Sequence, residues 1–294
     1  MIDTITKHKR SSHDKYYFSL IIPSWNNLDY LKNCITSIRK NSFLKNQIIV
    51  IVNEGNDGTV NWLETMPEID YIFSKENLGI CYGLNSARTL IDSEYIVYLN
   101  DDMYVLPGWD KVLYDEIKDL RSKSFMLSST MIEPKNTENP CVIIKDFGRD
   151  LKTFNEDLLL NEFESLKTND WSGSMWPPLV VHLDVWDLVG GMSIEFSPGM
   201  YSDPDFARKL FEAGVRTFKG MGASLVYHFG SKTTKRLGKS KGRIIFISKW
   251  RHSASIFKKY FLRIGNDFSD LSAVIEINKL TLFINKLKRI LSSW

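Results

Sequence analysis

The sequence predicts an α/β fold, in which a mostly parallel sheet is flanked by helices and followed by a basic, helical C-terminal extension. Three observations support this. Apolar runs of strand length alternate with segments of helical periodicity over roughly the first hundred residues. Polar clusters follow most of these runs. Basic residues dominate the end of the chain, where the acidic residues beyond Ser231 are Asp267, Asp270 and Glu276. With 294 residues and 43% hydrophobic content, the chain can bury one large core.

Short units of strand and helix make up the first half of the chain. Asn27 is the expected N-cap of the first helix, in which apolar residues from Leu31 to Ile38 recur at helical spacing. The alternation is typical of a doubly wound, Rossmann-type parallel sheet. The expected elements are a strand at 18–23, a helix at 28–40, strands at 47–52 and 71–73, a helix opening within 77–85, and a strand at 95–99.

Polar side chains follow three of these strands, at 53–58, 77–85 and 100–102. Because the carboxyl ends of parallel strands meet at one edge of a sheet, we expect a ligand site there. Asp101 and Asp102 directly follow a buried strand, and an unpaired carboxylate is costly inside a sheet core. Their hard oxygen atoms suit Mg²⁺ or Mn²⁺ together with phosphate. The alternative is an acidic turn, since Asp and Asn are common in turns.

Ionisable residues also stand at element boundaries in the second half. A helix is predicted after residue 203, because apolar residues recur at helical spacing from Phe206 and Gly214 follows them. Pro204 suits the first helical position, so Asp203 is the expected N-cap. His228 follows an apolar run that predicts a further strand.

Together, these pieces resemble the family 2 glycosyltransferases of GT-A fold. The resemblance extends from about Tyr17 to Ser231, and it depends on the order and spacing of motifs that are weak singly. It implies transfer of a sugar from a nucleotide-diphosphate donor, with a divalent metal and usually with inversion at the anomeric carbon. The matching pieces are Pro23 and Asn26, the loop 53–58, Asn77 with Gly79 and Asn85, the element 100–102, and the segments 189–191, 202–208 and 227–231.

The resemblance also implies roles for individual residues. Asp102 is the expected ligand of Mn²⁺ or Mg²⁺, and His228 is expected to complete the metal site or to contact the diphosphate. Asp203 is the expected general base, with Asp205 as the alternative. The residues expected to bind the nucleotide sugar are Pro23, Asn26, Asn53, Glu54, Asp57, Asn77, Gly79, Asn85, Arg88, Asn100 and Asp101.

Two positions depart from the family pattern. Asn53 stands where members commonly carry an Asp that contacts the nucleobase, so Glu54 or Asp57 is a candidate for that role and the nucleobase stays open. Ser202 stands where members often carry a Glu before the base. These departures keep an alternative function in view: a catalytically degenerate protein that binds nucleotide sugars or acts as a scaffold.

Trp171 and Trp176 lie in a turn-rich stretch of the expected acceptor half. Aromatic faces stack on sugar rings, so the two tryptophans either line the acceptor pocket or cover the sheet. The expected acceptor is a hydroxyl of a glycan or glycolipid, in the synthesis of a surface polysaccharide or glycolipid.

The chain divides into a flexible tail at 1–15, a catalytic domain at 16–231 and an extension at 232–294. Within the domain, 16–105 is the expected nucleotide-binding half and 106–231 the acceptor half. The extension begins with a basic loop expected to fold over the phosphates. An amphipathic helix at 270–291 is expected either to contact an anionic membrane surface, or to pack on the catalytic domain or on a second subunit of a homodimer.

Several partners and locations are disfavoured by the sequence. It contains no base-reading motif, so we expect no nucleic-acid partner. Its first residues lack an apolar signal core, and it contains no apolar run of about 18 residues. The three cysteines form no CxxC pair, which favours a reducing compartment. We therefore expect a cytoplasmic protein, with the C-terminal helix as its candidate contact with the inner face of the cell membrane.

Overall fold

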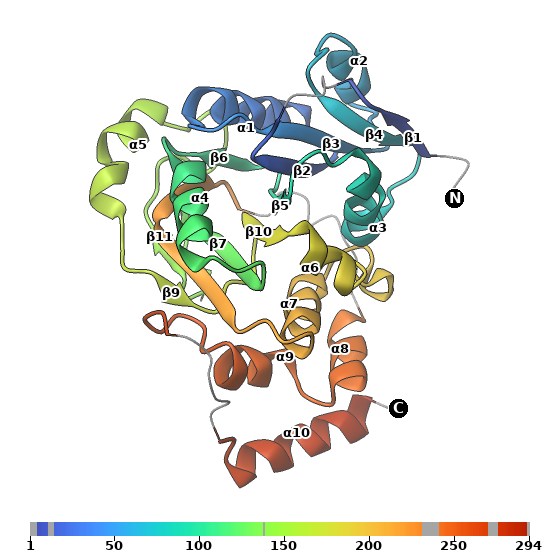
Figure 1. The fold of residues 1–294 in the computed structure, drawn as a ribbon, viewed down its shortest axis with the longest axis vertical. Helices are drawn as coiled ribbons and strands as arrows, with labels where there is room; N and C mark the ends of the chain where they lie inside the picture. Colours follow the sequence, from blue (N-terminus) through green and yellow to red (C-terminus); the bar gives the residue numbers. More distant parts are fainter. Residues whose placement is uncertain (1–4, 11–14, 138, 231–240, 270–275, 293–294) are drawn as a thin grey trace.

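One large mixed sheet with helices on both faces forms the body of the protein, and α10 lies at its far end (Figure 1). The computed structural model describes residues 5–10, 15–137, 139–230, 241–269 and 276–292. The strand order is β1-β4-β3-β2-β5-β10-β7-β11-β6, with β8 beside β7 and β9 beside β11. The strands are β1 (Ile5–His8), β2 (Phe18–Trp25), β3 (Gln47–Asn53), β4 (Asp70–Ser74), β5 (Tyr95–Tyr98), β6 (Met103–Val105), β7 (Phe125–Glu133), β8 (Val142–Ile144), β9 (Trp171–Ser172), β10 (Leu179–His182) and β11 (Thr217–His228).

The helices cover two separate apolar faces of this sheet. Side chains of a strand point alternately to its two faces. On one face, Ile49 and Ile51 of β3 pack in a core with residues of α3 and α7, whereas Val50 packs on the other face with residues of α1 and α4. The helices are α1 (Leu28–Asn41), α2 (Thr59–Glu64), α3 (Gly79–Ser86), α4 (Trp109–Leu120), α5 (Glu156–Glu162), α6 (Leu183–Leu188), α7 (Ser202–Glu212), α8 (Gly242–Trp250), α9 (Ala254–Ile256) and α10 (Lys279–Ser292).

The predicted α/β class is confirmed, and the strands β2, β3, β4 and β5 are parallel as predicted. β2 pairs in parallel with β3 and β5, and β3 pairs in parallel with β4. The carboxyl ends of these strands therefore face the same edge.

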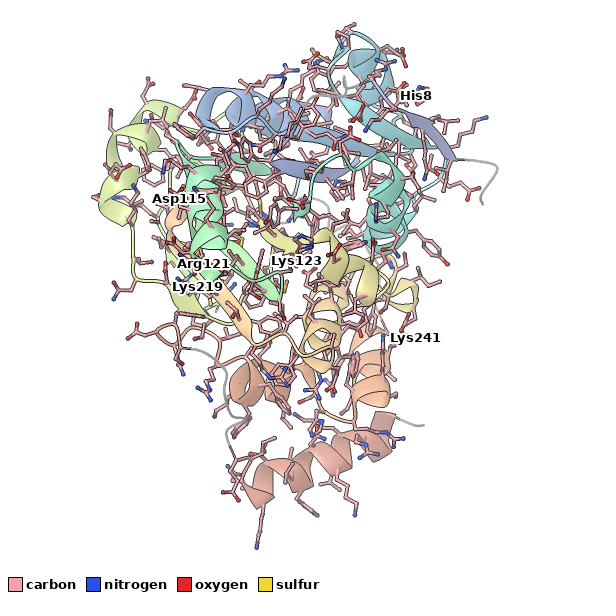
Figure 2. All side chains as sticks on the ribbon, in the orientation of Figure 1. His8, Asp115, Arg121, Lys123, Lys219 and Lys241 are labelled. Carbon is pink, nitrogen blue, oxygen red and sulfur yellow. The ribbon has the colours of Figure 1, made fainter. Side chains whose placement is uncertain are left out.

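In the second half, the sheet becomes mixed. β10 runs antiparallel between β5 and β7, while β11 runs parallel to β7 and antiparallel to β6. Lys219 of β11, which is labelled in Figure 2, lies 2.8 Å from Glu116 of α4 and 3.0 Å from Asp170. These ion pairs hold α4 and the segment before β9 against the strand that ends at His228.

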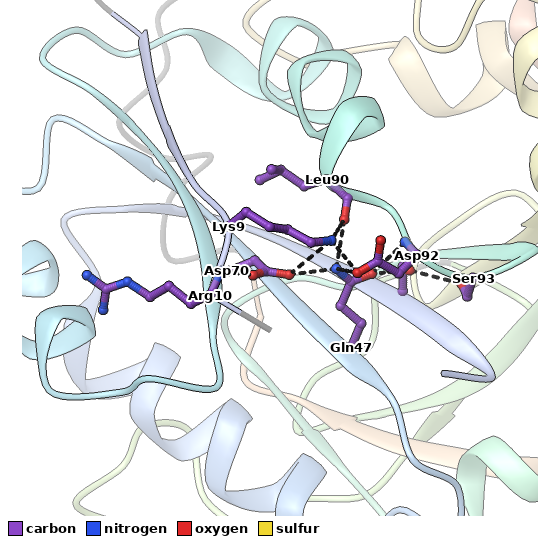
Figure 3. A network of polar contacts seen from close by, with 8 residues as sticks. Lys9, Arg10, Gln47, Asp70, Leu90, Asp92 and Ser93 are labelled. Carbon is purple, nitrogen blue, oxygen red and sulfur yellow. Dashed lines mark hydrogen bonds and ion pairs between the residues drawn. The ribbon is translucent and has the colours of Figure 1, made fainter. Parts of the chain in front are cut away.

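The prediction of a flexible tail over 1–15 is wrong for Ile5–His8, which form β1 and pair antiparallel with β4. The residues after β1 explain why this segment is fixed. Lys9 donates a hydrogen bond of 2.6 Å to the carbonyl of Leu90 and forms an ion pair with Asp92 (Figure 3). The backbone amide of Arg10 donates to Asp70, a fully buried carboxylate that also accepts from Gln47 at 2.6 Å. The segment after β1 thus supplies a hydrogen bond to the buried carboxylate of Asp70, at the amino end of β4.

Part of the predicted extension 232–294 belongs to the main core. Phe246 of α8, Phe257 and Leu262 are buried in the same apolar cluster as α7. The following residues run along β9, where the amide of Ser172 donates to the carbonyl of Asn266 at 2.8 Å. The predicted basic loop at 230–236 lies outside the described residues from residue 231 on, as do 270–275 and Trp294.

The C-terminal helix begins later than predicted, at Lys279, and residues 276–278 are not helical. It contacts α8, and its Asn285 donates to the carbonyl of Arg251 and accepts from the amide of Ser253, both of which lie between α8 and α9. Among the described residues, every helix is too short or too polar to cross a lipid bilayer.

Candidate functional site

A cavity of about 910 Å³ opens at the edge of the sheet where β2, β3 and β5 end. It is lined on one side by the strand ends and the element 100–102, and on the other by the start of α7. The predicted site residues that line it are Pro23, Asn53, Asn77, Gly79, Asn100, Asp101, Asp102, Trp176, Asp203 and His228. The structure therefore brings together the candidate metal ligands, the first-choice base and part of the candidate nucleotide site.

Asp101 and Asp102 occupy the short turn between β5 and β6, and each is only 4% exposed. The turn is tied to the end of β11, because the amide of Phe229 donates to the carbonyl of Asp102 at 3.1 Å. This bond follows from the antiparallel pairing of β11 with β6, in which His228 lies opposite Met103. The acidic turn is thus a packed part of the sheet edge.

His228 lies between two carboxylates. Its Nε2 is 3.3 Å from Oδ1 of Asp102, and its Nδ1 is 2.6 Å from Oε1 of Glu133. Burial acts to lower the pKa of the imidazole, but Asp102 and Glu133 outweigh it and raise that pKa to about 10. The imidazole is consequently protonated at neutral pH, and it must release that proton to bind a metal ion.

Asp102 and His228 have the right donors for a divalent ion. Two cis donors at about 2.1 Å from an octahedral ion lie about 3 Å apart, close to the observed separation of 3.3 Å. Glu133 is placed to orient the imidazole through Nδ1, as carboxylates beside metal-bound histidines do. Within the described residues, no group of three His, Cys, Asp or Glu side chains is arranged as a complete metal site. The pair fits an ion whose remaining ligands are diphosphate oxygens and water.

Asp203 lies in the first turn of α7 and lines the cavity. The prediction that it is the N-cap is wrong: the helix already begins at Ser202, and Tyr201 is the N-cap, with a φ of 73°. Its Oδ1 is buried without a hydrogen-bond partner among the described residues. Burial raises the pKa of Asp203 to about 7, and a hydrogen bond from Ser202 offsets part of this rise.

Asp205, the alternative base, lies outside the cavity. It is fully buried, accepts a hydrogen bond of 2.7 Å from the indole of Trp250, and lies 3.0 Å from Lys249. These contacts join α7 to α8. Of the two candidates, Asp203 alone faces the cavity.

The candidate nucleotide-binding residues near the strand ends are held by contacts with the backbone. Asn53 accepts from the amide of Leu78 at 2.9 Å, and Asn77 accepts from the amide of Gly79 at 2.8 Å. Gly79 has a φ of 70°, and a Cβ atom there would lie 2.6 Å from Cα of Pro198. Only glycine fits this close approach, which brings the loop around Pro198 onto the cavity.

Five predicted nucleotide-binding residues do not line the cavity. Asp57 binds the amides of Leu28 and Thr59, and so links the starts of α1 and α2. Arg88 forms an exposed, bidentate pair with Asp187, both hydrogen bonds measuring 2.6 Å. The other three are Asn26, which hydrogen-bonds Glu54 at 2.9 Å, Glu54 itself, and Asn85, which exchanges two hydrogen bonds of 2.8 Å with the backbone of Met192.

The two candidate acceptor tryptophans have different positions. Trp171 is buried, packs on Gly220 of β11 and donates from its indole to Thr130 at 2.8 Å, so it covers the sheet. Trp176 lines the cavity, and Nζ of Lys258 lies 5.4 Å from the centre of its ring.

Sequence reasoning missed Glu133 and Lys258 as residues that line the cavity. The signal for Glu133 was present, because it ends the apolar run of β7 in the same way that Asp101 follows β5. Lys258 lies far along the chain, on a π-helical turn at Phe257–Phe261, and no motif points to it.

Comparisons with known proteins find relatives of this chain by sequence and by fold. Among curated proteins, glycosyltransferase GlyA of Streptococcus pneumoniae is 25% identical over 108 residues, which are 35% of this chain and 15% of that protein. The uncharacterized glycosyltransferase YfnE of Bacillus subtilis is 33% identical over 89 residues, 29% of this chain and 23% of that protein. The chain thus matches less than a quarter of the length of each of these relatives.

Solved structures share the fold at low sequence identity. S. aureus TarS 1–349 in complex with UDP has a TM-score of 0.53 and 14% identity, covering 72% of this chain and 60% of that one. GalNAc-T7 with UDP, GalNAc and Mn²⁺ has a TM-score of 0.57 and 12% identity, covering 85% and 51%. The model of glycosyl transferase family 2 matches residues 19–173, more than half of the chain. The chain belongs to glycosyl transferase family 2.

Proposed function

We propose that this protein transfers a sugar, with inversion, from a nucleoside diphosphate sugar to a hydroxyl of a glycan or glycolipid acceptor, in the synthesis of a surface polysaccharide or glycolipid. The observation that carries the proposal is the position of Asp203, which shares one cavity with Asp102 and His228. A UDP-sugar is the first donor to test, because the fold neighbours named above were solved with UDP.

In the proposed reaction, the acceptor oxygen attacks the anomeric carbon on the side opposite the diphosphate. The new bond joins this oxygen to the carbon, while the bond between the carbon and the phosphate oxygen breaks and its electron pair leaves with the diphosphate. Asp203 accepts the proton of the acceptor hydroxyl. A carboxylate with a pKa of about 7 is suited to this role, because a base works best when its pKa is near the working pH.

Asp102 and His228 would hold Mn²⁺ or Mg²⁺. Such an ion, when bound, supplies positive charge to the leaving diphosphate. Glu133 keeps Nε2 of His228 turned toward Asp102 by binding the opposite ring nitrogen. Asn53, Asn77 and Gly79 offer backbone and amide groups to the nucleotide at the strand ends.

The test is a panel of UDP-sugars and acceptors, with release of UDP measured in the presence of Mn²⁺. A donor should raise the melting temperature with Mn²⁺ and release UDP when an acceptor is added. Binding of UDP and Mn²⁺ without UDP release for any pair would favour the alternative, a degenerate nucleotide-sugar-binding or scaffold protein. Failure of every nucleotide diphosphate to bind would contradict both.

For the C-terminal helix we propose a peripheral contact with an anionic membrane at its cytoplasmic face. The residues Leu280, Phe283, Ile284 and Leu287 recur at the spacing of one helix face, and Leu280 is 68% exposed. Asn285, which binds Arg251 and Ser253, points to the opposite side. Lys286 and Lys288 flank the apolar face, and each lysine near an anionic surface adds about 1 kcal/mol to binding. A second copy of the chain on this face is the competing outcome.

A further inference from the structure

A second cavity, of about 670 Å³, adjoins the candidate active site. The two cavities share five lining residues, namely Thr137, Asn139, Trp176, Ser255 and Lys258. The second cavity continues from this shared wall toward Lys259 and Arg263 of the C-terminal segment. A molecule that enters the active site past Trp176 therefore meets a wall built by residues 255–266.

The charged side chains that line the second cavity are basic. Lys258, Lys259 and Arg263 line it, and among the described residues no Asp or Glu does. No ion pair to a described residue is recorded for Lys258 or Lys259, whose ammonium groups instead lie over the rings of Trp176 and Tyr260 at 5.4 and 5.5 Å. Partial burial lowers the pKa of Lys258, because the ammonium loses water without gaining a carboxylate partner.

The wall is also firmly positioned. The amide of Gly265 donates to the carbonyl of Ser172 at 3.1 Å, and Ile264 packs directly on Gly173, where a Cβ atom would lie 2.4 Å from it. Phe257 and Leu262 anchor the same segment in the main core. Binding at this wall therefore does not require the basic residues to fold into place first, which lowers its entropic cost.

We propose that this cavity is an acceptor subsite for an anionic group, a phosphate or a carboxylate carried by the acceptor next to the sugar that receives the transfer. The inference rests on the proposed function and narrows it to a class of acceptor. The sugar stacks on Trp176 at the junction of the two cavities. The neighbouring anion pairs with Lys258 and Lys259, which are charge-assisted donors.

Binding of small probes to the full chain, saturated with UDP and Mn²⁺, tests the subsite. The probes are glycerol 3-phosphate, glucuronate and neutral glucose, titrated by ligand-observed NMR. A further arm uses dihexanoyl phosphatidylglycerol below its micelle concentration, which separates a lipid headgroup from a soluble phosphate. We expect at least one anionic probe to bind roughly ten-fold or more tightly than glucose.

Lys259→Gln should weaken that binding roughly ten-fold, and Lys258→Gln should do the same. Lys259 lines only the second cavity, so Lys259→Gln should leave the affinity for UDP and Mn²⁺ unchanged. Lys152→Gln is the matched control, because it removes one exposed positive charge that lines neither cavity. Equal binding of glucose and the anions, or unchanged anion binding in Lys259→Gln, would overturn the subsite alone, because the proposed function is judged separately, by release of UDP from a donor when an acceptor is present. Failure of every nucleoside diphosphate to bind would overturn both.

Discussion

Nε2 of His228 lies 3.3 Å from Oδ1 of Asp102, although the two residues come from opposite halves of the chain. The antiparallel pairing of β11 with β6 sets this approach, because it places His228 opposite Met103. Both side chains are therefore held by a sheet, and small movements of surface loops do not separate them.

Asp102→Ala should abolish Mn²⁺-dependent binding of UDP, because it removes the carboxylate of the candidate metal pair. Isothermal calorimetry of UDP with and without Mn²⁺ measures the effect. Asp115→Ala, at an exposed position on α4, is the control and should bind like the wild type. The metal assignment fails if Asp102→Ala still binds UDP and Mn²⁺ with wild-type affinity.

Asp203→Asn should lower turnover by roughly 10² or more with little change in UDP affinity, since the amide keeps the shape but cannot accept the proton. Asp205→Asn is the comparison. Asp205 lies outside the cavity, so its replacement should lower stability through the lost contacts with Lys249 and Trp250 and leave the folded enzyme active. An inactive but folded Asp205→Asn beside a normal Asp203→Asn would move the base to Asp205.

The pH dependence of the rate should report the raised pKa of Asp203. A base acts only when ionised, so kcat/KM should rise about ten-fold per pH unit up to a pH of about 7 and then level off. The stability of the fold should change with pH in the opposite direction to the rate. Because folding raises this pKa above about 3.9, the carboxyl favours the folded state at low pH, and that contribution is lost as pH rises through about 7. The melting temperature of Asp203→Asn, relative to that of the wild type, should therefore rise between pH 5 and pH 8. A difference in melting temperature that stays constant over this range would contradict the raised pKa.

Gly79→Ala should destabilise the protein more than Gly108→Ala does. Both glycines have a positive φ, 70° and 75°, where alanine costs about 1–2 kcal/mol. At Gly79 the new Cβ atom also meets Pro198 at 2.6 Å, whereas nothing lies within 4 Å at Gly108. Overpacking adds about 1–3 kcal/mol. Urea unfolding of the two variants measures the difference, and equal losses would show that the loop at Pro198 moves aside freely.

Leu280→Glu should reduce sedimentation with anionic vesicles several-fold without lowering the melting temperature. Leu188→Glu is a close control, since Leu188 is 71% exposed on α6 and Leu280 is 68% exposed on α10. Binding of the wild type should also weaken with salt. If the wild type never sediments with vesicles, and Leu280→Glu converts a dimer to a monomer in gel filtration, the apolar face binds a second copy.

The strands that end at the site were predictable because apolar runs and the polar residues after them are local signals. Asn53, Asn77 and Asp102 could thus be assigned to one sheet edge before the fold was known. Glu133 carried the same local signal. The resemblance to a family then supplied roles that periodicity alone does not give, as for Asp203.

Other features depend on contacts between distant parts of the chain. The four residues of β1 have no strong strand pattern, and the strand forms because β4 offers an unpaired edge and Asp70 a buried charge. Asp203 and Asp205 lie close together in the sequence, and no local pattern shows which of them faces the cavity. Asp205 lies outside it because it packs against Trp250 of α8. Lys258 reaches the site because its segment runs back along β9.

The position of β1 at the end of the strand order has a consequence for solubility. An uncovered edge strand is a template for pairing with other chains, and β4 would be such an edge without β1. β1 itself is short, and Thr6 and Lys7 are exposed on it, a composition that discourages further strand addition. A chain shortened to begin at Tyr17 would keep every residue of the candidate active site yet should aggregate during refolding at concentrations that the full chain tolerates.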